Sequence, residues 1–416
     1  MPAPDGRHAA AASSPLRMTP VERRASVSLA TLFAFRMLGL FLILPVFGAH
    51  APSLPGGNDP TMVGLALGVY GLTQGLLQLP FGLASDRFGR KPVIVFGLVL
   101  FALGSVMAAG ADDIVGTIVG RAVQGAGAIS AAVTAFIADH TRDSQRTKAM
   151  AMVGASIGLT FALSLVVAPV LYGWVGMAGL FHLTAVLALA GIAIVAFAVP
   201  PLPAAAGGAD RAGGDAAATR TPLRRVALDG DLIRLNVGIF ALHLVQMAMF
   251  VVLPVWLVER AGLPLPQHWQ VYLPVVLVSF ALMLPPLVWG ERTGRMRIVF
   301  LAAIALIALV QAGYALQPSG LLPLAALLLV FFAAFNVLEA SLPSLVSRLA
   351  PVDAKGAALG IYNTTQALGL FAGGALGGWV AARFGAAWVF VGCTAVVLAW
   401  LAAASTARRW PQRAAA

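Results

Sequence analysis

Charge is scarce in this chain of 416 residues. Asp, Glu, Lys and Arg together make up 10% of it, while hydrophobic residues make up 60%. Soluble domains are typically about a quarter charged, so this deficit argues against an ordinary water-soluble protein. Apolar runs of about 20 residues recur instead, which is the length of helix that crosses the hydrocarbon core of a bilayer. Barrel strands would alternate over about ten residues, so the sequence predicts an all-α membrane protein.

Cysteine and metal-ligand spacings are lacking as well. Cys393 is the single cysteine, which excludes a disulfide within one chain and a cysteine metal cluster. The six histidines are scattered without metal-ligand spacing, and no glycine-rich phosphate loop is followed by Lys and Ser or Thr. We therefore expect no metal, no cofactor, no ATP site and no enzymatic activity.

Twelve apolar segments are predicted to cross the membrane. An Ala-, Gly- and Pro-rich connector at 200–231 separates two six-helix bundles at 27–199 and 232–405, with tails at 1–26 and 406–416. The predicted spans are 27–47, 61–83, 92–110, 114–137, 148–172 and 179–199, then 233–257, 270–289, 298–316, 320–346, 357–379 and 386–405.

Basic residues are distributed unevenly around these spans. With the N-terminus inside, the outer loops hold only Arg260 and Arg383, the interiors of the spans hold Arg36 and Arg121, and every other Lys and Arg lies in an inner segment or at the inner end of a span. The positive-inside rule then places both termini in the cytoplasm. Because the positive charge is spread over many short segments, it indicates topology and does not favour nucleic-acid binding.

A charged turn occurs twice in the chain. It follows the second predicted span of each bundle, which indicates two related halves, a known transporter plan. The first copy contains Asp86, Arg87, Gly89 and Arg90, and the second contains Glu291, Arg292, Gly294 and Arg295.

Three stretches resemble signatures of the major facilitator superfamily, in the expected order. GLASDRFGRKP (82–92) resembles the loop between helices 2 and 3, and RAVQGAGA (121–128) resembles the helix 4 signature. LGLFLILPV (38–46) resembles helix 1 of the twelve-helix drug/proton antiporters, and LEASLPSLVSRLAP (338–351) looks most like the YajR-type branch. The resemblance implies a secondary transporter with two pseudo-symmetric six-helix bundles. We expect a monomer in the inner cell membrane, energised by a proton gradient.

The helix 5 signature of these antiporters is only partly present. Ala168, Pro169 and Gly173 occupy its positions, with the proline and the last glycine retained and the other glycines absent. We expect export of a small amphipathic or hydrophobic molecule in exchange for protons. A proton-coupled importer with the same fold stays an alternative, and a membrane receptor without transport is a further one.

The first charged turn is expected to act as a conformational latch. The resemblance implies that Asp86 faces the N-terminal end of helix 11 near Gly356, where the partial positive charge favours a carboxylate. Asp139 could hold Arg90. These contacts should exist only when the cytoplasmic side is closed, and simple anchoring at the membrane surface is the alternative. The predicted latch consists of Gly82, Asp86, Arg87, Gly89, Arg90, Lys91 and Asp139, and its reduced copy of Glu291, Arg292, Gly294 and Arg295.

Glu339 is the one acid that falls deep within a span, in predicted helix 10. An ionisable group at this depth marks a functional site by default, and burial disfavours its charged form, so Glu339 is the candidate proton carrier. Asn336 lies three residues earlier on the same helix face. The alternative for Glu339 is a fixed ion pair with Arg36 or Arg121.

Four further polar residues belong to the predicted cavity. In the family fold, helices 1, 4, 7 and 10 line the centre, which assigns Arg36, Arg121, Gln124 and His243 to it. A histidine can titrate near neutral pH. The alternative role for the two arginines is a structural contact between helices, and for His243 it is a satisfied polar contact.

Overall fold

The computed structural model describes residues 18–200, 222–351 and 354–407, apart from a few side chains within helices. These residues form helices, turns and short connections, so the all-α prediction is confirmed. The predicted tails fall largely outside the described residues, as does the connector from 201 to 221.

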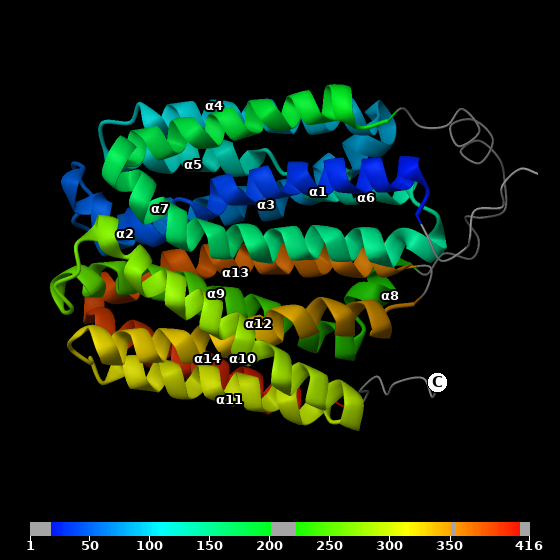
Figure 1. Cartoon of the computed structure of the whole chain (residues 1–416). Helices are drawn as coiled ribbons and strands as arrows, with labels where there is room; N and C mark the ends of the chain where they lie inside the picture. The colour runs from blue at the N-terminus through cyan, green and yellow to red at the C-terminus, as the bar shows by residue number, and fades with distance from the viewer. Residues whose placement is uncertain (1–17, 201–221, 352–353, 408–416) are drawn as a thin grey trace, which may run out of the picture.

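The first half of the chain forms one bundle (Figure 1). Two of its spans are broken. The first span is interrupted at Leu42 and Ile43, and the helix resumes at Leu44. The fourth span is interrupted at the glycine-rich stretch after Ala126. Its helices are α1 (Pro20–Phe41), α2 (Leu44–His50), α3 (Pro60–Phe88), α4 (Arg90–Ala109), α5 (Ile114–Ala126), α6 (Ser130–His140) and α7 (Asp143–Ala193), with short turns at Ala51–Ser53 and Ile194–Ala198.

The second half forms the other bundle, in the lower part of Figure 1. Its helices are α8 (Leu223–Ala227), α9 (Gly230–Glu259), α10 (Trp269–Thr293), α11 (Met296–Ala315), α12 (Leu321–Leu349), α13 (Lys355–Phe384) and α14 (Ala386–Ser405), with a 3₁₀ turn at Leu265–Gln267. The helices of both halves run along one common axis (Figure 1).

The described residues contain eleven helices that are long and apolar enough to span a membrane, against the twelve predicted spans. The difference lies in α7. Gly176 has φ 64° and ψ −171°, which are not helical values, and the chain kinks there. Predicted spans 148–172 and 179–199 lie on either side of this kink, so both fall within the single stretch formed by α7 and the turn at Ile194–Ala198.

Two helices begin before the predicted start of their spans. Helix α1 begins at Pro20, within the predicted tail, because Thr19 and Glu22 form a capping box. The Thr19 hydroxyl accepts from the Glu22 amide, and the Glu22 carboxylate accepts from the Thr19 amide at 2.7 Å, which satisfies amides that would otherwise lack partners. Likewise, the predicted connector contains α8, and α9 begins at Gly230 with Asp229 as its cap.

Glycines allow α3 and α13 to join the two bundles closely at one end. A Cβ atom at Gly64 would collide with the backbone of Gly374, and one at Gly378 would collide with the carbonyl of Pro60. Farther along α13, a Cβ atom at Gly356 or Gly360 would meet nothing within 4 Å. The two helices therefore touch at one end of the molecule and diverge toward the other.

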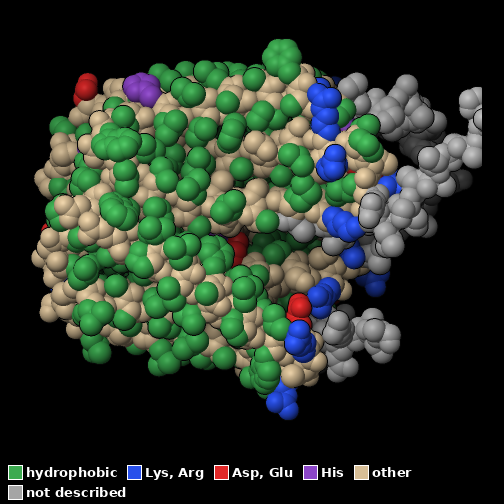
Figure 2. Space-filling view, viewed as in Figure 1, with side chains coloured by type: hydrophobic (Ala, Val, Ile, Leu, Met, Phe, Trp, Pro, Cys, Tyr) green, Lys and Arg blue, Asp and Glu red, His purple; other side chains and the backbone are tan. Residues whose placement is uncertain are grey.

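The open end is the basic one. Lys and Arg side chains gather at the right edge of Figure 2, and a hollow between the two halves opens toward that edge, with an acidic side chain at its inner end. We call this the basic end; it carries the turn between α3 and α4. The opposite, far end is closed. There Gly48 packs on the second bundle, and a Cβ atom at this glycine would lie 3.3 Å from the carbonyl oxygens of Phe250 and Val251.

Candidate transport site

Glu339 forms a polar cluster with two side chains of neighbouring helices. Its Oε2 lies 3.8 Å from Nε2 of His243 on α9, and its Oε1 accepts from Nε2 of Gln366 on α13 at 3.5 Å. Gln366 Nε2 also lies 2.7 Å from His243 Nε2. The predicted residues Glu339 and His243 are thus brought together, and Gln366 connects them.

This cluster lies where partly exposed side chains meet the buried core of the protein. The Glu339 side chain is 33% exposed, whereas that of His243 is 7% exposed. Within the described residues, Glu339 Oε2 and the buried Tyr362 hydroxyl have no hydrogen-bond partner. Asn336 donates to Ser279 on α10 at 3.1 Å, so its amide links α12 to α10.

Aromatic rings close the space on the far side of the cluster. Phe161 on α7 lies 5.7 Å from Phe332 and 6.2 Å from Phe335 of α12, measured between ring centroids, and 5.0 Å from Phe41. Because α12 runs from the far end to the basic end, Glu339 follows Phe335 by one turn toward the hollow. Glu339 therefore lies on the basic-end side of these aromatic rings.

Arg36 and Arg121 lie in the core of the first bundle, each 1% exposed. Arg36 donates to Ser130 at 3.0 Å, and its guanidinium lies 5.9 Å from the centre of the Tyr70 ring. Arg121 lies 5.0 Å from the same ring and donates to Gln124 at 2.7 Å and to the Ala66 carbonyl at 3.3 Å. These contacts belong to one bundle.

The alternative of a fixed ion pair between Glu339 and either arginine is therefore wrong for this conformation. Gln124 extends the arginine network to Ser105 at 2.8 Å and to Thr184 at 3.4 Å. Hydrogen bonds and the aromatic face of Tyr70 stabilise the two cations here. Among the described residues, neither guanidinium contacts a carboxylate.

The first charged turn forms an ion network within its own bundle. Arg90 donates to Asp139 at 2.9 Å, as expected, and to Ser85 at 2.7 Å, and it forms an ion pair with Asp86. Lys91 donates to the carbonyl of Val199 at 3.0 Å. A Cβ atom at Gly82 would lie 3.4 Å from the Cβ atom of Ala131. The Arg87 guanidinium lies 5.4 Å from the centre of the Phe88 ring.

The predicted contact of Asp86 with helix 11 is not made in this conformation. The Asp86 side chain is 62% exposed, and the space at Gly356 on α13 is open. The basic end is open, so this agrees with a contact restricted to a closed state, and the latch stays a prediction. Nearby, Glu22 accepts from Arg142 at 2.8 Å, and this hydrogen bond raises the pKa of Arg142.

The second charged turn keeps the backbone and has fewer contacts. Gly294 ends α10 in the left-handed region, with φ 70°. The Arg295 guanidinium lies 5.7 Å from the Trp289 ring, and Glu291 and Arg292 are exposed. Within the described part of the chain, Glu291 has no ion pair.

The helix 5 residues lie toward the far end. Pro169 lies within α7 and Ala168 is fully buried. A Cβ atom at Gly173 would lie 3.0 Å from Pro266 of the other bundle. This glycine therefore allows close approach of the bundles where they meet.

Sequence reasoning missed Gln366 and Tyr362. A signal was available, because the stretch from Tyr362 to Gln366, YNTTQ, is polar within an otherwise apolar span. It also passed over Phe161, whose role depends on contacts with another bundle that helical spacing does not reveal.

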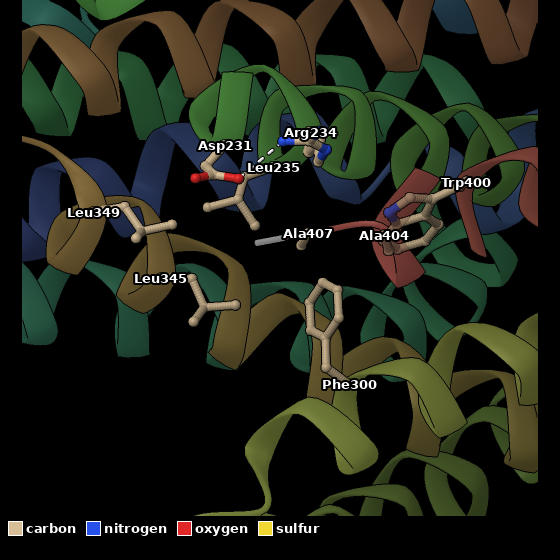
Figure 3. Close-up of a pocket in the computed structure, with 9 residues that line it drawn as sticks. All are labelled: Asp231, Arg234, Leu235, Phe300, Leu345, Leu349, Trp400, Ala404 and Ala407. Carbon is tan, nitrogen blue, oxygen red and sulfur yellow. Dashed lines mark hydrogen bonds and ion pairs between the residues drawn. The ribbon is translucent and has the colours of Figure 1, made fainter. Parts of the chain in front are cut away.

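A separate pocket opens within the second bundle near the basic end (Figure 3). An ion pair between Arg234 and Asp231, at 2.9 Å, lies at the pocket, beside apolar side chains. Because its walls come from α9, α11, α12 and α14, it does not lie between the bundles. It is lined by Asp231, Arg234, Leu235, Phe300, Leu345, Leu349, Trp400, Ala404 and Ala407.

The family model of the Major Facilitator Superfamily matches residues 26–373. The chain belongs to the major facilitator superfamily. It is 42% identical over 395 residues to the inner membrane transport protein YajR of Escherichia coli K12, covering 95% of this chain and 86% of that protein.

More distant relatives match along most of their length as well. The multidrug resistance protein MdtH of Proteus mirabilis is 28% identical over 370 residues, covering 83% of this chain and 84% of that one. A bacterial homologue of the human lysosomal transporter Spinster, solved in an inward-facing and occupied conformation, superposes with a TM-score of 0.75 at 11% identity, covering 94% and 97%. The chain is thus a multi-pass membrane transporter with the major facilitator fold.

Proposed function

We propose that this transporter exports a small amphipathic or hydrophobic molecule across the inner membrane in exchange for protons. The observation that carries the proposal is the position of Glu339. Its side chain lies at mid-span, is one-third exposed and is adjacent to an imidazole. A group that gains and loses a proton at this depth can couple substrate movement to the membrane potential, since one charge is worth about 2.3 kcal/mol per 100 mV.

Alternating access is supported by the difference between the two ends. Glycine packing closes the far end, and the hollow opens at the basic end. With the basic end in the cytoplasm, as the distribution of Lys and Arg predicts, this conformation faces inward. Export then requires the basic end to close, and the turn after α3 is placed to stabilise that closure.

The aromatic wall supports an amphipathic or hydrophobic substrate. Phe161, Phe332 and Phe335 offer apolar surface beside the polar cluster. Such a combination of apolar lining and few polar groups is typical of small-molecule sites. The name of the MdtH relative agrees with this class of substrate.

A flux assay in reconstituted vesicles tests the proposal. Protein in liposomes with an internal pH dye is given an outwardly or inwardly directed gradient of ethidium, an amphipathic fluorescent cation, alongside a panel of uncharged amphipathic dyes. We expect substrate movement to drive protons the opposite way. In Glu339→Gln this proton flux should fall by about 100-fold, a loss typical of removing a positioned proton-transfer group, while exchange of substrate for substrate persists.

Glu259→Gln is the matched control, because Glu259 is an exposed acid of the same bundle at the far end. It should transport like the wild type. Proton flux in the same direction as the substrate would replace export with import. Unchanged proton coupling in a stably folded Glu339→Gln variant would remove Glu339 as the carrier.

A further inference from the structure

The Gln366 amide occupies a position between two groups that can exchange a proton. Its Nε2 lies 2.7 Å from His243 Nε2 and 3.5 Å from Glu339 Oε1, whereas the two ionisable groups are 3.8 Å apart. Three different helices, α13, α9 and α12, supply these side chains. The amide therefore has a shorter contact with His243 than the carboxylate has.

The backbone fixes the state of His243 in this conformation. Its Nδ1 lies 3.2 Å from the carbonyl oxygen of Ile239, which can only accept, so Nδ1 carries a hydrogen. With Gln366 Nε2 donating to the other nitrogen, that nitrogen must be the acceptor, and the ring is neutral. The same NH₂ group directs its second hydrogen toward the Glu339 carboxylate.

A proton on His243 reverses the requirement at Nε2. Both ring nitrogens would then donate, and Nε2–H would face the NH₂ group of Gln366. Rotation of the amide by about 180° presents its oxygen instead, and the terminal torsion of glutamine is broad and roughly two-fold, so this rotation is accessible. The rotation also withdraws an N–H donor from Glu339. The state of one group is thereby transmitted to the other.

Few other groups can take part in this exchange. Tyr362 of α13 is the remaining titratable group beside Glu339, and its buried hydroxyl has no partner among the described residues. Helix α10 contributes the neutral Ser279, and α7 contributes Phe161. Helix α14 contains no Asp, Glu, Lys or Arg, and the closest approaches of α3 to α13 are made by glycines. Arg36 and Arg121 form their contacts within the other bundle.

We propose that Gln366 is a positioning residue whose amide orientation couples the protonation state of His243 to that of Glu339. In the observed orientation, His243 is neutral and Glu339 is held by an N–H donor. In the rotated orientation, His243 is protonated and donates to the amide oxygen. The use of this coupling in transport rests on the proposed function, but the hydrogen-bond exchange does not.

NMR titration of histidine side chains in the full-length protein tests this coupling. Histidine is isotope-labelled, and the His243 signal is assigned by its loss in His243→Gln. We expect wild-type His243 to carry its hydrogen on Nδ1 at neutral pH. In Gln366→Leu, the ring loses a hydrogen bond in both protonation states, and the charge-assisted bond of the protonated state is the stronger, so the titration midpoint of His243 should fall by about one pH unit, a tenfold change in proton affinity.

Gln311→Leu is the matched control. Gln311 is a fully buried glutamine of the same bundle, and neither of its amide atoms has a hydrogen-bond partner among the described residues. Its removal should leave the His243 midpoint in place. Melting of both variants is followed with a thiol-reactive dye, since Cys393 is 3% exposed and reacts on unfolding. If Gln366→Leu does not fold, Gln366→Met, unbranched and of similar length, replaces it.

An unchanged His243 midpoint in a folded Gln366 variant overturns the inference, as does an equal shift in Gln311→Leu. The inference and the proposed function fail separately. A shifted midpoint together with normal proton flux in Glu339→Gln keeps the hydrogen-bond coupling and removes the transport role. An unchanged midpoint together with lost flux in Glu339→Gln does the reverse.

Discussion

The turn after α3 and the turn after α10 occupy equivalent places in the two bundles but have different contacts. Both contain a glycine with positive φ, 95° at Gly89 and 70° at Gly294. Only the first turn places an arginine between two carboxylates, with Arg90 contacting Asp86 and Asp139. Both copies therefore retain the sharp chain reversal, while the ion network is present in one.

This difference shows that the glycine and the carboxylates of the repeated turn meet separate structural requirements. The glycine is needed wherever two long helices reverse direction within one or two residues. The carboxylates are needed only where the loop takes part in holding the basic end. Three predictions test the comparison, from the largest expected effect to the smallest.

Substituting Gly89 should cost more than substituting Gly294. Gly89 has φ 95° and ψ 155°, a region that is essentially restricted to glycine, whereas Gly294 has φ 70° and ψ 15°, which asparagine tolerates. We expect Gly89→Asn to lower the free energy of unfolding by about 1–3 kcal/mol and Gly294→Asn by less than about 1 kcal/mol. Thermal melting read by the Cys393 thiol measures both, and equal losses would contradict the comparison.

Removing the arginine should matter in the first turn and hardly in the second. The Arg90 and Asp139 side chains are 13% and 24% exposed, so their pair lies between a surface pair and a buried one. We expect Arg90→Met to cost about 1–2 kcal/mol, because it leaves a partly buried carboxylate unpaired. Arg295→Met, which removes a contact with Trp289, should cost less than about 0.5 kcal/mol. Similar melting temperatures of the two variants would show that the ion network does not stabilise the first turn.

Asp86→Asn should shift the balance between conformations without affecting folding. A carboxylate at a helix N-terminus gains about 0.3–1 kcal/mol, so its loss should raise the ratio of open to closed basic ends by about two- to fivefold. Spin labels at Phe88 and Lys355, in a Cys393→Ser background, report the distance between the loop after α3 and the start of α13.

Glu291→Gln is the control for this measurement, because it removes the corresponding acid of the second turn. Its distance distribution should match that of the parent protein, and its transport should be less impaired than that of Asp86→Asn. A shift in Glu291→Gln and none in Asp86→Asn would transfer the latch role to the second turn. An unchanged distribution in both would leave simple anchoring at the membrane surface.

The spans were predictable because lipid imposes one requirement on every residue that faces it. Backbone groups must be satisfied within the helix, so long apolar runs identify spans regardless of their neighbours. Helix starts follow local signals instead, as with the capping box that starts α1 at Pro20, ahead of the predicted span. At Gly176 a single positive φ angle ends one helical span and begins the next within α7, and hydropathy does not report such an angle.

The candidate site was predictable only in part. A lone deep acid such as Glu339 is conspicuous in an apolar span. Its partners His243 and Gln366 come from α9 and α13, far from it in the sequence, and helical spacing within α12 gives no information about them. Opposite charge alone suggested an ion pair between Glu339 and Arg36 or Arg121. In the structure, both arginines instead contact Tyr70 in the other bundle.

The sequence by itself determined that this protein spans a membrane as two related six-helix halves with their positive charge on one side, because composition, length and charge distribution act residue by residue. Only the tertiary structure decided that Gln366 joins Glu339 to His243, that the two arginines remain apart from the acid, and that the molecule is closed at the far end and open at the basic end. Those outcomes depend on which helix faces meet. Helices α3 and α13 meet through glycines, and no pattern within either helix specifies that these glycines approach one another closely.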